Sequence, residues 1–275
     1  MIKVGFDKEL HKYFNLETGE LLISATTLIH HHYTPPFDGA FWSFYKAIER
    51  VLGTDEFKPY KRVLNGNKDI NFATYYFRNH PKLDDFLSVQ QTILGEWQKT
   101  NLDACEKGTA FHDAQEAAAI GAKTTTHPDC EEILNVFAFG MHLDLEDLPI
   151  GYYPELRLYN LDYGVAGTSD CIWILPGKQV YVSDYKTNKQ LKFENKYQKM
   201  LYPLNHLDDC NFNHYQIQLS LYGYMLECMG YIIKGMEIIY EGEAIPFEYR
   251  REDVITMLNH YQANKEPIHV EDHSL

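Results

Sequence analysis

The sequence has no long hydrophobic segment. No run of about eighteen apolar residues occurs, and the N-terminus lacks a cationic stretch followed by an apolar one. The five cysteines are an odd number, show no paired spacing and include no CxxC pair. This usage is typical of reduced thiols in a reducing compartment rather than of a disulfide scaffold. We therefore expect a cytoplasmic, unprocessed protein with no membrane partner.

Basic residues are also scarce. Lys and Arg total 25 against 39 Asp and Glu, which gives a formal net charge of −14. A protein that coats nucleic acid by overall electrostatics needs clustered positive charge, so any nucleic-acid site here has to be local. Bound divalent cations or a short lysine-rich segment could supply that charge. With 45% apolar and 23% charged residues, the composition excludes a disordered or fibrous chain.

The first part of the chain predicts a hairpin followed by helices. Residues 11–29 have the pattern of a β-hairpin that leads, from a cap at Ser24 or Thr26, into a helix. Three histidines, His30 to His32, then interrupt the pattern. Because consecutive side chains point in different directions, we expect a loop there without a ligand role. The other predicted features up to residue 120 are helices over 38–52 and 84–120 and an irregular surface insertion over 53–82. The basic residues of 53–82 alternate with aromatic ones, so this segment could instead contact a nucleic-acid strand.

From residue 151 the sequence changes to strands. The segments 152–160, 163–175 and 179–187 are rich in β-formers and are joined by turn signals, so we expect an antiparallel meander. We found no internal repeat, low-complexity tract or interdomain linker, which favours one α/β domain. The elements predicted after the meander are a lysine-rich, partly helical stretch, a helix over 214–229, a strand over 235–240 and a helix over 252–264.

Two carboxylates lie where the meander strands approach one another. Asp170 closes a Gly-Thr-Ser-Asp segment in one predicted strand, and Asp184 stands two residues before Lys186 near the end of the next. Adjacent carboxylates repel unless a cation lies between them, and hard oxygen ligands suit Mg²⁺ or Mn²⁺. Such a cation activates water for phosphodiester hydrolysis. Strand alternation puts Lys186 on the face of Asp184, where its ammonium could stabilise developing negative charge.

An acidic-x-Lys triplet is weak evidence when it stands alone. Only the Asp184 copy ends an apolar β-run next to a strand that carries a second aspartate. On these residues alone, Asp170 and Asp184 could still be ordinary exposed carboxylates at strand ends. The other two copies of the triplet are Glu56-Phe57-Lys58 and Glu194-Asn195-Lys196.

Two helical pairs add candidate site residues. His112 and Glu116 are four residues apart, hence on one helical face, and could complete an oxygen-rich metal site. Gln218 and Tyr222 share a face in the same way and could hydrogen-bond phosphate oxygens. Taken singly, His112 could equally be a packed or exposed histidine, and the second pair could belong to an amphipathic helix with tyrosine in the core.

In their order along the chain, these motifs resemble the RecB-type branch of the PD-(D/E)XK nucleases, which includes phage exonucleases and the mitochondrial genome maintenance exonuclease. That branch carries Gly-x-x-x-His, an upstream Glu, Gly-x-x-Asp, Asp-x-Lys and Gln-x-x-x-Tyr. The resemblance covers about residues 10–240. It implies a restriction-endonuclease-like core, a central mixed β-sheet flanked by helices, with a helical N-terminal elaboration. The matching residues are Gly108 and His112, Glu155, Gly167 and Asp170, Asp184 and Lys186, and Gln218 and Tyr222.

The resemblance also implies roles for individual residues. The implied metal ligands are His112, Asp170, Asp184 and the backbone carbonyl of Tyr185. The implied catalytic residues are Asp170, Asp184, Lys186 and, as a supporting carboxylate, Glu155. The residues expected at the DNA are Gln218, Tyr222, Glu116, Thr187 and Lys189.

The activity implied by the resemblance is that of a Mg²⁺- or Mn²⁺-dependent DNA exonuclease. It would cut DNA that is single-stranded or has free ends, leaving a 5′-phosphate, in replication, recombination or repair in a bacterium or a phage-infected cell. The sequence lacks a GxxxxGK(S/T) phosphate loop, so strand separation would need a helicase partner. A recombinase, a single-strand-binding protein or further copies of the chain are other candidate partners. The late cysteines do not form the trio of the iron–sulfur relatives, so no iron–sulfur cluster is expected.

We expect one nuclease domain over residues 1–275, with the hairpin and helical elaboration in 10–107, the catalytic core in 108–245 and a C-terminal helix and tail in 246–275. Two alternatives stay open. The first is a non-catalytic DNA-end-binding or assembly subunit of the same fold, against which the intact Asp170, Asp184 and Lys186 argue. The second is a metal-dependent hydrolase of another substrate, which is compatible with the acidic net charge.

Overall fold

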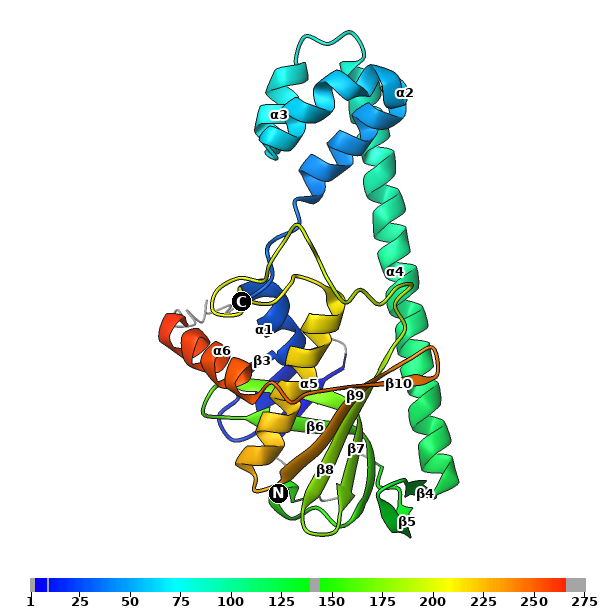
Figure 1. The fold of residues 1–275 in the computed structure, drawn as a ribbon, viewed down its shortest axis with the longest axis vertical. Helices are drawn as coiled ribbons and strands as arrows, with labels where there is room; N and C mark the ends of the chain where they lie inside the picture. The colour runs from blue at the N-terminus through cyan, green and yellow to red at the C-terminus, as the bar shows by residue number, and fades with distance from the viewer. Residues whose placement is uncertain (1–2, 9, 139–143, 266–275) are drawn as a thin grey trace, which may run out of the picture. The chain divides into compact units, whose positions relative to one another are not determined.

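The protein has an α/β fold in which helices flank a mixed β-sheet, as predicted (Figure 1). The computed structural model describes residues 3–8, 10–138 and 144–265. By its internal contacts the chain divides into two compact units, one formed by Met1–Pro35 with Ala110–Leu275 and the other by Pro36–Thr109. The predicted hairpin belongs to the first unit, so the segment 10–107 is not a single part of the structure.

The main sheet contains eight strands within the described residues. Seven of them follow the order β1-β2-β3-β7-β8-β9-β10. The eighth strand, β6, lies outside this order and pairs with β7. The turns of the predicted N-terminal hairpin and of the predicted meander form where their residues predict them. The strands are β1 (Val4–Asp7), β2 (Lys12–Asn15), β3 (Leu21–Ser24), β6 (Gly151–Asn160), β7 (Val165–Leu175), β8 (Gln179–Lys186), β9 (Ile232–Tyr240) and β10 (Glu243–Phe247), with β4 (Thr124–His127) and β5 (Cys130–Asn135) in a separate two-stranded ribbon.

Strand β7 has different neighbours along its two edges. One edge pairs with antiparallel β6 over its whole length. The other edge is shared, because β3 pairs in parallel with Val165 and Ala166 while β8 pairs with the stretch from Cys171 to Leu175. Within the described strands, neither neighbour pairs with residues 167–170. The edge of β7 therefore opens between β3 and β8, at the Gly-Thr-Ser-Asp segment.

Three helices form a layer on one face of the sheet (Figure 1). Helix α5 (Asn211–Cys228) packs on β6 to β9, and both α1 (Ala25–His32) and α6 (Arg251–Asn264) pack on α5. Ser24 caps α1 by accepting a hydrogen bond from the backbone N–H of Thr27, as the sequence predicted. The large apolar core of this unit lies between the helical layer and the meander strands.

The second unit is helical and has its own core. It contains α2 (Gly39–Gly66), α3 (Ile70–Phe77) and the first part of α4 (Leu83–Ala122), which continues into the first unit. Aromatic side chains dominate this core, where Phe77 lies edge-on to Phe44 and Phe86. Gly53 has a positive φ of 76° and breaks α2 in its middle. A short 3₁₀ helix, η1 (Leu145–Asp147), precedes β6.

Three local predictions were wrong. Residues 53–82 are largely helical rather than irregular. In this part of α2, Phe57 and Leu64 are buried two helical turns apart while most of their neighbours are exposed. So few buried positions leave little hydrophobic periodicity in the sequence. His30 to His32 form the last turn of α1 rather than a loop. The lysine-rich stretch after β8 contains no helix in its described residues 187–210. The sequence reading also missed β1 and β10, whose short runs acquire strand geometry from the neighbour that they pair with.

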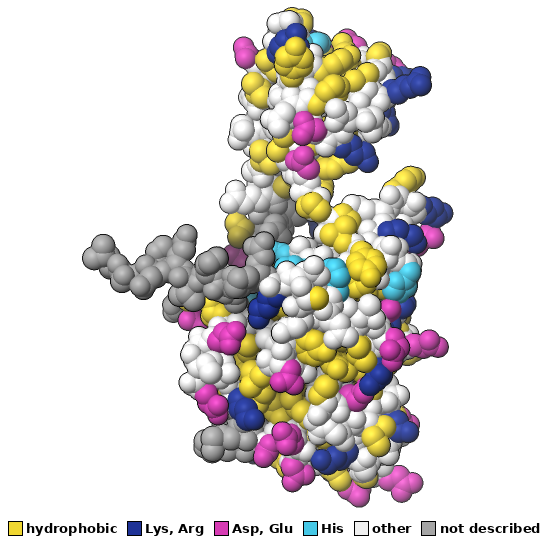
Figure 2. Space-filling model, turned by 90° about the vertical axis from the view of Figure 1, so that its left-hand side faces the viewer, with side chains coloured by type: hydrophobic (Ala, Val, Ile, Leu, Met, Phe, Trp, Pro, Cys, Tyr) yellow, Lys and Arg dark blue, Asp and Glu magenta, His cyan; other side chains and the backbone are white. Residues whose placement is uncertain are grey.

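Acidic and basic side chains are mixed on the face drawn in Figure 2, without a continuous region of one sign. Among the described helices, none is both long enough and apolar enough to span a membrane.

Candidate metal centre

The two aspartates of the strand motifs lie where β7 and β8 separate. The ladder between these strands stops at the pair Cys171 and Ser183, one position before Asp170 and Asp184. Beyond that point the backbone N–H of Tyr185 donates to Asp170 Oδ2 over 2.8 Å instead of to a carbonyl of β7. The carboxylate thus replaces a strand partner. Both aspartates are buried in consequence.

Glu155 comes to the same place from β6. Its neighbours pair in register with Cys171 and Ser169, which sets Glu155 opposite Asp170. Like charges in that position destabilise a sheet. Glu155 also has a left-handed backbone, with φ of 52°, a conformation that costs a non-glycine residue about 1–3 kcal/mol and clusters at functional sites. Repulsion and strain at one position favour a functional role for this carboxylate over a structural one.

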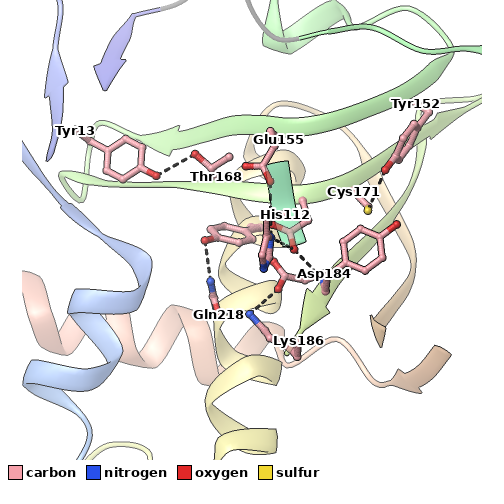
Figure 3. Close-up of polar contacts among 12 residues, drawn as sticks. Tyr13, His112, Tyr152, Glu155, Thr168, Cys171, Asp184, Lys186 and Gln218 are labelled. Carbon is pink, nitrogen blue, oxygen red and sulfur yellow. Dashed lines mark hydrogen bonds and ion pairs between the residues drawn. The ribbon is translucent and has the colours of Figure 1, made fainter. Parts of the chain in front are cut away.

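His112 reaches these carboxylates from α4. Its Nδ1 atom lies 3.1 Å from Asp170 Oδ2 and 3.9 Å from Glu155 Oε1. One ligand atom from each of the three side chains lies within 4.8 Å of the others, a spacing at which one cation can contact all three. The three side chains come from a helix and two strands, and Figure 3 shows His112 and Glu155 pointing toward one another. Gln115, Glu116 and Tyr152 line the same small pocket.

Asp184 and Lys186 form a buried ion pair beside this group. Lys186 Nζ lies 2.5 Å from Asp184 Oδ2. The same Asp184 oxygen is buried and, within the described residues, receives no aligned hydrogen bond, so the contact is an ion pair in poor hydrogen-bond geometry. Lys186 also donates to Gln218 Oε1 over 3.3 Å and lies 4.4 Å from the centre of the Tyr215 ring. The ammonium is thereby held in place from both β8 and α5 (Figure 3).

Gln218 and Tyr222 extend this network along α5. Gln218 Nε2 donates to Tyr222 Oη over 3.1 Å. The ring of Tyr222 is buried against β7 at Gly167, where an added Cβ would lie 2.5 Å from the ring. The glycine of the Gly-x-x-Asp motif thus allows helix α5 to approach the strand that carries Asp170.

The protonation equilibria show an excess of negative charge. Burial, and then repulsion from Asp170, raise the pKa of Glu155 to about 7 and that of Asp184 to about 6. The hydrogen bond to Asp170 raises the pKa of His112 despite its burial. Burial acts to lower the pKa of Lys186, but the carboxylates of Asp184 and Asp170 outweigh it, so this pKa is also raised. Every shift favours a bound proton, as expected of a site that lacks enough positive charge.

The donor set fits a hard divalent cation. Two carboxylates and one imidazole, those of Glu155, Asp170 and His112, lie within metal-ligand spacing, and the carboxylate of Asp184 lies beside them. Burial and mutual repulsion raise the pKa of Glu155 and of Asp184, and one buried oxygen of Asp184 lacks an aligned donor. Mg²⁺ and Mn²⁺ prefer such oxygen-rich sites, and Mn²⁺ also accepts an imidazole. Among the described residues, the group His112, Glu155 and Asp170 is the one cluster of histidine and acidic side chains with metal-ligand spacing.

The structure brings most of the predicted site residues together. Asp170, Asp184, Lys186, His112 and Gln218 meet as described above. Glu155, expected only as a supporting carboxylate, stands with the ligand atoms, while Asp184 lies just outside that trio and faces Lys186. Thr187 and Lys189 are exposed at the start of the connection after β8. Tyr185 donates its backbone N–H to Asp170, and its ring lies edge-on to that of His112.

Sequence reasoning missed one contribution to the site. Tyr185 supplies its backbone N–H to Asp170, a role that depends on strand separation and has no sequence signal. Glu155 was expected from the resemblance, and in the structure it interrupts the otherwise buried start of β6. The lysines of the two rejected acidic-x-Lys triplets are exposed. Lys58 pairs with Asp55 in α2, and Lys196 pairs with Glu194 on a loop.

No protein-family model matches the chain, and no curated protein matches it either. The functional argument therefore depends on the motifs and on the geometry of this site.

Proposed function

We propose that the protein is a Mg²⁺-dependent DNA nuclease that hydrolyses phosphodiester bonds, acting as an exonuclease at DNA ends in replication, recombination or repair. The observation that carries the proposal is the meeting of Glu155, Asp170 and Asp184 with His112 and the buried ammonium of Lys186. Hydrolysis of a phosphodiester needs ligands for the metal ion and a positive group near the phosphate. The carboxylates would bind the metal, and the ammonium of Lys186 would stabilise the negative charge that develops in the reaction.

His112, Glu155, Asp170 and Asp184 are the residues that would hold the cation. A bound Mg²⁺ would polarise a phosphoryl oxygen and lower the pKa of an attacking water. The raised pKa values of Glu155 and Asp184 mean that cation binding has to displace protons, so occupancy should increase with pH.

Lys186 supplies the positive charge of the site that comes from a protein side chain rather than from the bound cation. Its pKa is raised, so the ammonium stays charged at neutral pH. Asp184, Gln218 and the ring of Tyr215 restrict its position. In this role Lys186 Nζ donates hydrogen bonds to the water or to a phosphoryl oxygen and stabilises the charge that develops there. An already positioned donor does this without reorganisation during the reaction.

The DNA strand would lie along α5 and the start of the connection after β8. Gln218 has its amide next to Lys186, and Tyr222 fixes that amide by a hydrogen bond. Thr187 and Lys189 are exposed directly after Lys186, and Glu116 lines the pocket of the metal ligands. Action at ends rather than at specific sequences is favoured because the sequence carries no recognisable DNA-reading module such as a zinc finger.

Degradation of end-labelled DNA tests the proposal. Single- and double-stranded DNA are incubated with purified protein in Mg²⁺, Mn²⁺ or EDTA, and the label pattern separates digestion from an end from internal cutting. We expect cleavage only with a metal, and a loss of at least about a hundredfold in Asp170→Asn, Asp184→Asn and Lys186→Gln. A matched control is Glu56→Gln combined with Lys58→Gln, which changes the same triplet on an exposed helix.

Cleavage that is unaffected in the three site variants would overturn the assignment of this centre. If the wild type cleaves no DNA with any metal, the nuclease proposal fails, and the alternative of a DNA-end-binding or assembly subunit with this fold replaces it.

A further inference from the structure

The connection between β8 and α5, residues 187–210, is a long excursion without regular secondary structure (Figure 1). It is nevertheless anchored to the fold. Met200 and Leu204 are buried in the main core. Asn195 donates its side-chain amide to Asp209 O over 2.7 Å, and Asn211 accepts the backbone N–H of Lys192 over 2.7 Å. The surface of this connection is therefore presented in a defined conformation.

The first part of this connection carries a local excess of positive charge. Residues 187–201 contain four lysines and one glutamate in a chain whose net charge is −14, and the two aspartates of the connection follow at 208 and 209. The acidic groups beside them have partners, since Glu194 pairs with Lys196, Asp208 with Lys199, and Asp209 with His214. Within the described residues, Lys189 and Lys192 are exposed and make no ion pair.

A groove of about 770 Å³ lies along these lysines. Its lining includes Asn188, Lys189, Lys192 and Tyr197, together with the first turns of α5 near Asn211 and His214. Two aromatic rings project at this surface. The Tyr197 side chain is 97% exposed and that of Phe193 is 56% exposed, although the backbone N–H of Tyr197 is held by Asn195 over 3.1 Å. An ordered loop thus exposes an aromatic ring that the core does not use.

A chain of contacts links the groove to the candidate metal centre. Asn188, which lines the groove, hydrogen-bonds the Tyr215 hydroxyl, and the ring of Tyr215 lies under the ammonium of Lys186. A strand held in the groove would therefore lie close to the ammonium that is proposed to act on it.

We propose that this groove, lined by Lys189, Lys192 and Tyr197, holds an unpaired DNA strand, with a base stacked on the Tyr197 ring and phosphates paired with the two lysines. The inference rests on the proposed nuclease function and specifies single-stranded DNA as the substrate form. Inside a duplex each base face is covered by the next pair, so away from the duplex ends an exposed aromatic ring can stack only on a base that is unpaired. The lysines alone would not distinguish the two forms, because both carry phosphates.

Binding measured without turnover tests the inference. Fluorescence anisotropy follows a labelled thymidine oligomer of about 20 nucleotides and a blunt duplex of equal length in Ca²⁺, which is used here in place of Mg²⁺. We expect Tyr197→Ala to weaken binding of the single strand about tenfold and Tyr197→Phe to leave it unchanged, because the ring is retained. Duplex binding should change by less than about twofold in either variant, because only the two terminal pairs of the duplex leave a base face uncovered.

The lysines give a second, independent readout. Replacing Lys189 and Lys192 together by alanine should reduce the slope of log affinity against log salt by about 1.4 for the single strand. Lys12→Ala, which removes an exposed lysine from β2, is the matched control and should leave the slope unchanged.

The outcomes separate this inference from the proposed function. Wild-type protein that binds the single strand through Tyr197 but does not cleave it would support the groove and overturn the nuclease. Metal-dependent cleavage with single-strand binding that is equal in wild type and Tyr197→Ala would support the nuclease and overturn the groove.

Discussion

At the scale of single residues, the buried pair of Asp184 and Lys186 determines how the centre tolerates substitution. Replacing Lys186 by methionine leaves a buried carboxylate beside Asp170 without its cation. We expect this change to lower the free energy of unfolding by about 3 kcal/mol in metal-free buffer at neutral pH. The double variant Lys186→Met with Asp184→Asn should recover part of that loss, because the uncompensated charge is gone. Urea denaturation measures both, and a double variant no more stable than Lys186→Met would contradict the ion-pair explanation.

Glu155 makes the stability of the metal-free protein depend on pH. Burial and Asp170 raise its folded-state pKa to about 7, above the ordinary value of 4.5. The folded state therefore binds this proton more tightly than the unfolded state does. The resulting stabilisation is complete below about pH 4.5 and is lost as the pH rises through about 7.

Comparison with Glu155→Gln isolates this effect, because the amide does not titrate. In EDTA, the Tm of the variant minus that of the wild type should increase between about pH 5 and about pH 8. Adding Mn²⁺ should stabilise the wild type more at the higher pH, where the carboxylate is ionised. A difference in Tm that stays constant over this range would show that Glu155 has an ordinary pKa.

At the scale of elements, the close approach of α5 to β7 depends on Gly167. A Cβ at this position would lie 2.5 Å from the ring of Tyr222, which is buried and cannot move aside. We expect Gly167→Ala to lower the free energy of unfolding by about 1–3 kcal/mol. Tyr222→Leu in the same protein should reduce the cost of the alanine, and a double-mutant cycle in urea measures this coupling. Additive effects would mean that helix and strand do not meet there.

The strand arrangement explains why the centre forms at this edge. Residues 167–170 of β7 are not paired with either β3 or β8, so polar groups that a continuous sheet would use in its ladder are available for side chains. Tyr13 Oη contacts Thr168 Oγ1 over 2.9 Å, and the N–H of Tyr185 binds Asp170. The site thus forms in the gap along β7 where the pairing of β3 has ended and that of β8 has not begun.

At the scale of the whole molecule, the chain has two compact units with separate cores. We expect Phe77→Ala, which leaves a cavity in the helical unit, to cost that unit about 3–5 kcal/mol. Hydrogen exchange read by mass spectrometry should then show faster exchange of backbone amides in residues 36–109 and unchanged exchange in β6 to β8. Equal acceleration in both units would show that the chain unfolds as one cooperative system.

The predictability of the fold followed the strength of the local patterns. Strands β6 to β8 and helix α5 lay where alternation, turn residues and helical spacing placed them. Residues 53–82 gave no pattern because their helices bury few side chains, and the three histidines were read as a loop although α1 continues through them. Patterns report how one face of an element meets the core, so elements with little buried surface are hard to predict.

The sequence by itself determined the chemical groups of the candidate site and their order along the chain. Asp184 and Lys186 could be selected because they end a strongly β-forming segment, and Asp170 because it lies within the segment before it. Only the tertiary structure decided that Glu155 lies opposite Asp170 with a left-handed backbone, and that His112 reaches both from a distant helix. The physical reason is that strand register and helix packing depend on the whole core, whereas periodicity and turn chemistry act between neighbours in the chain.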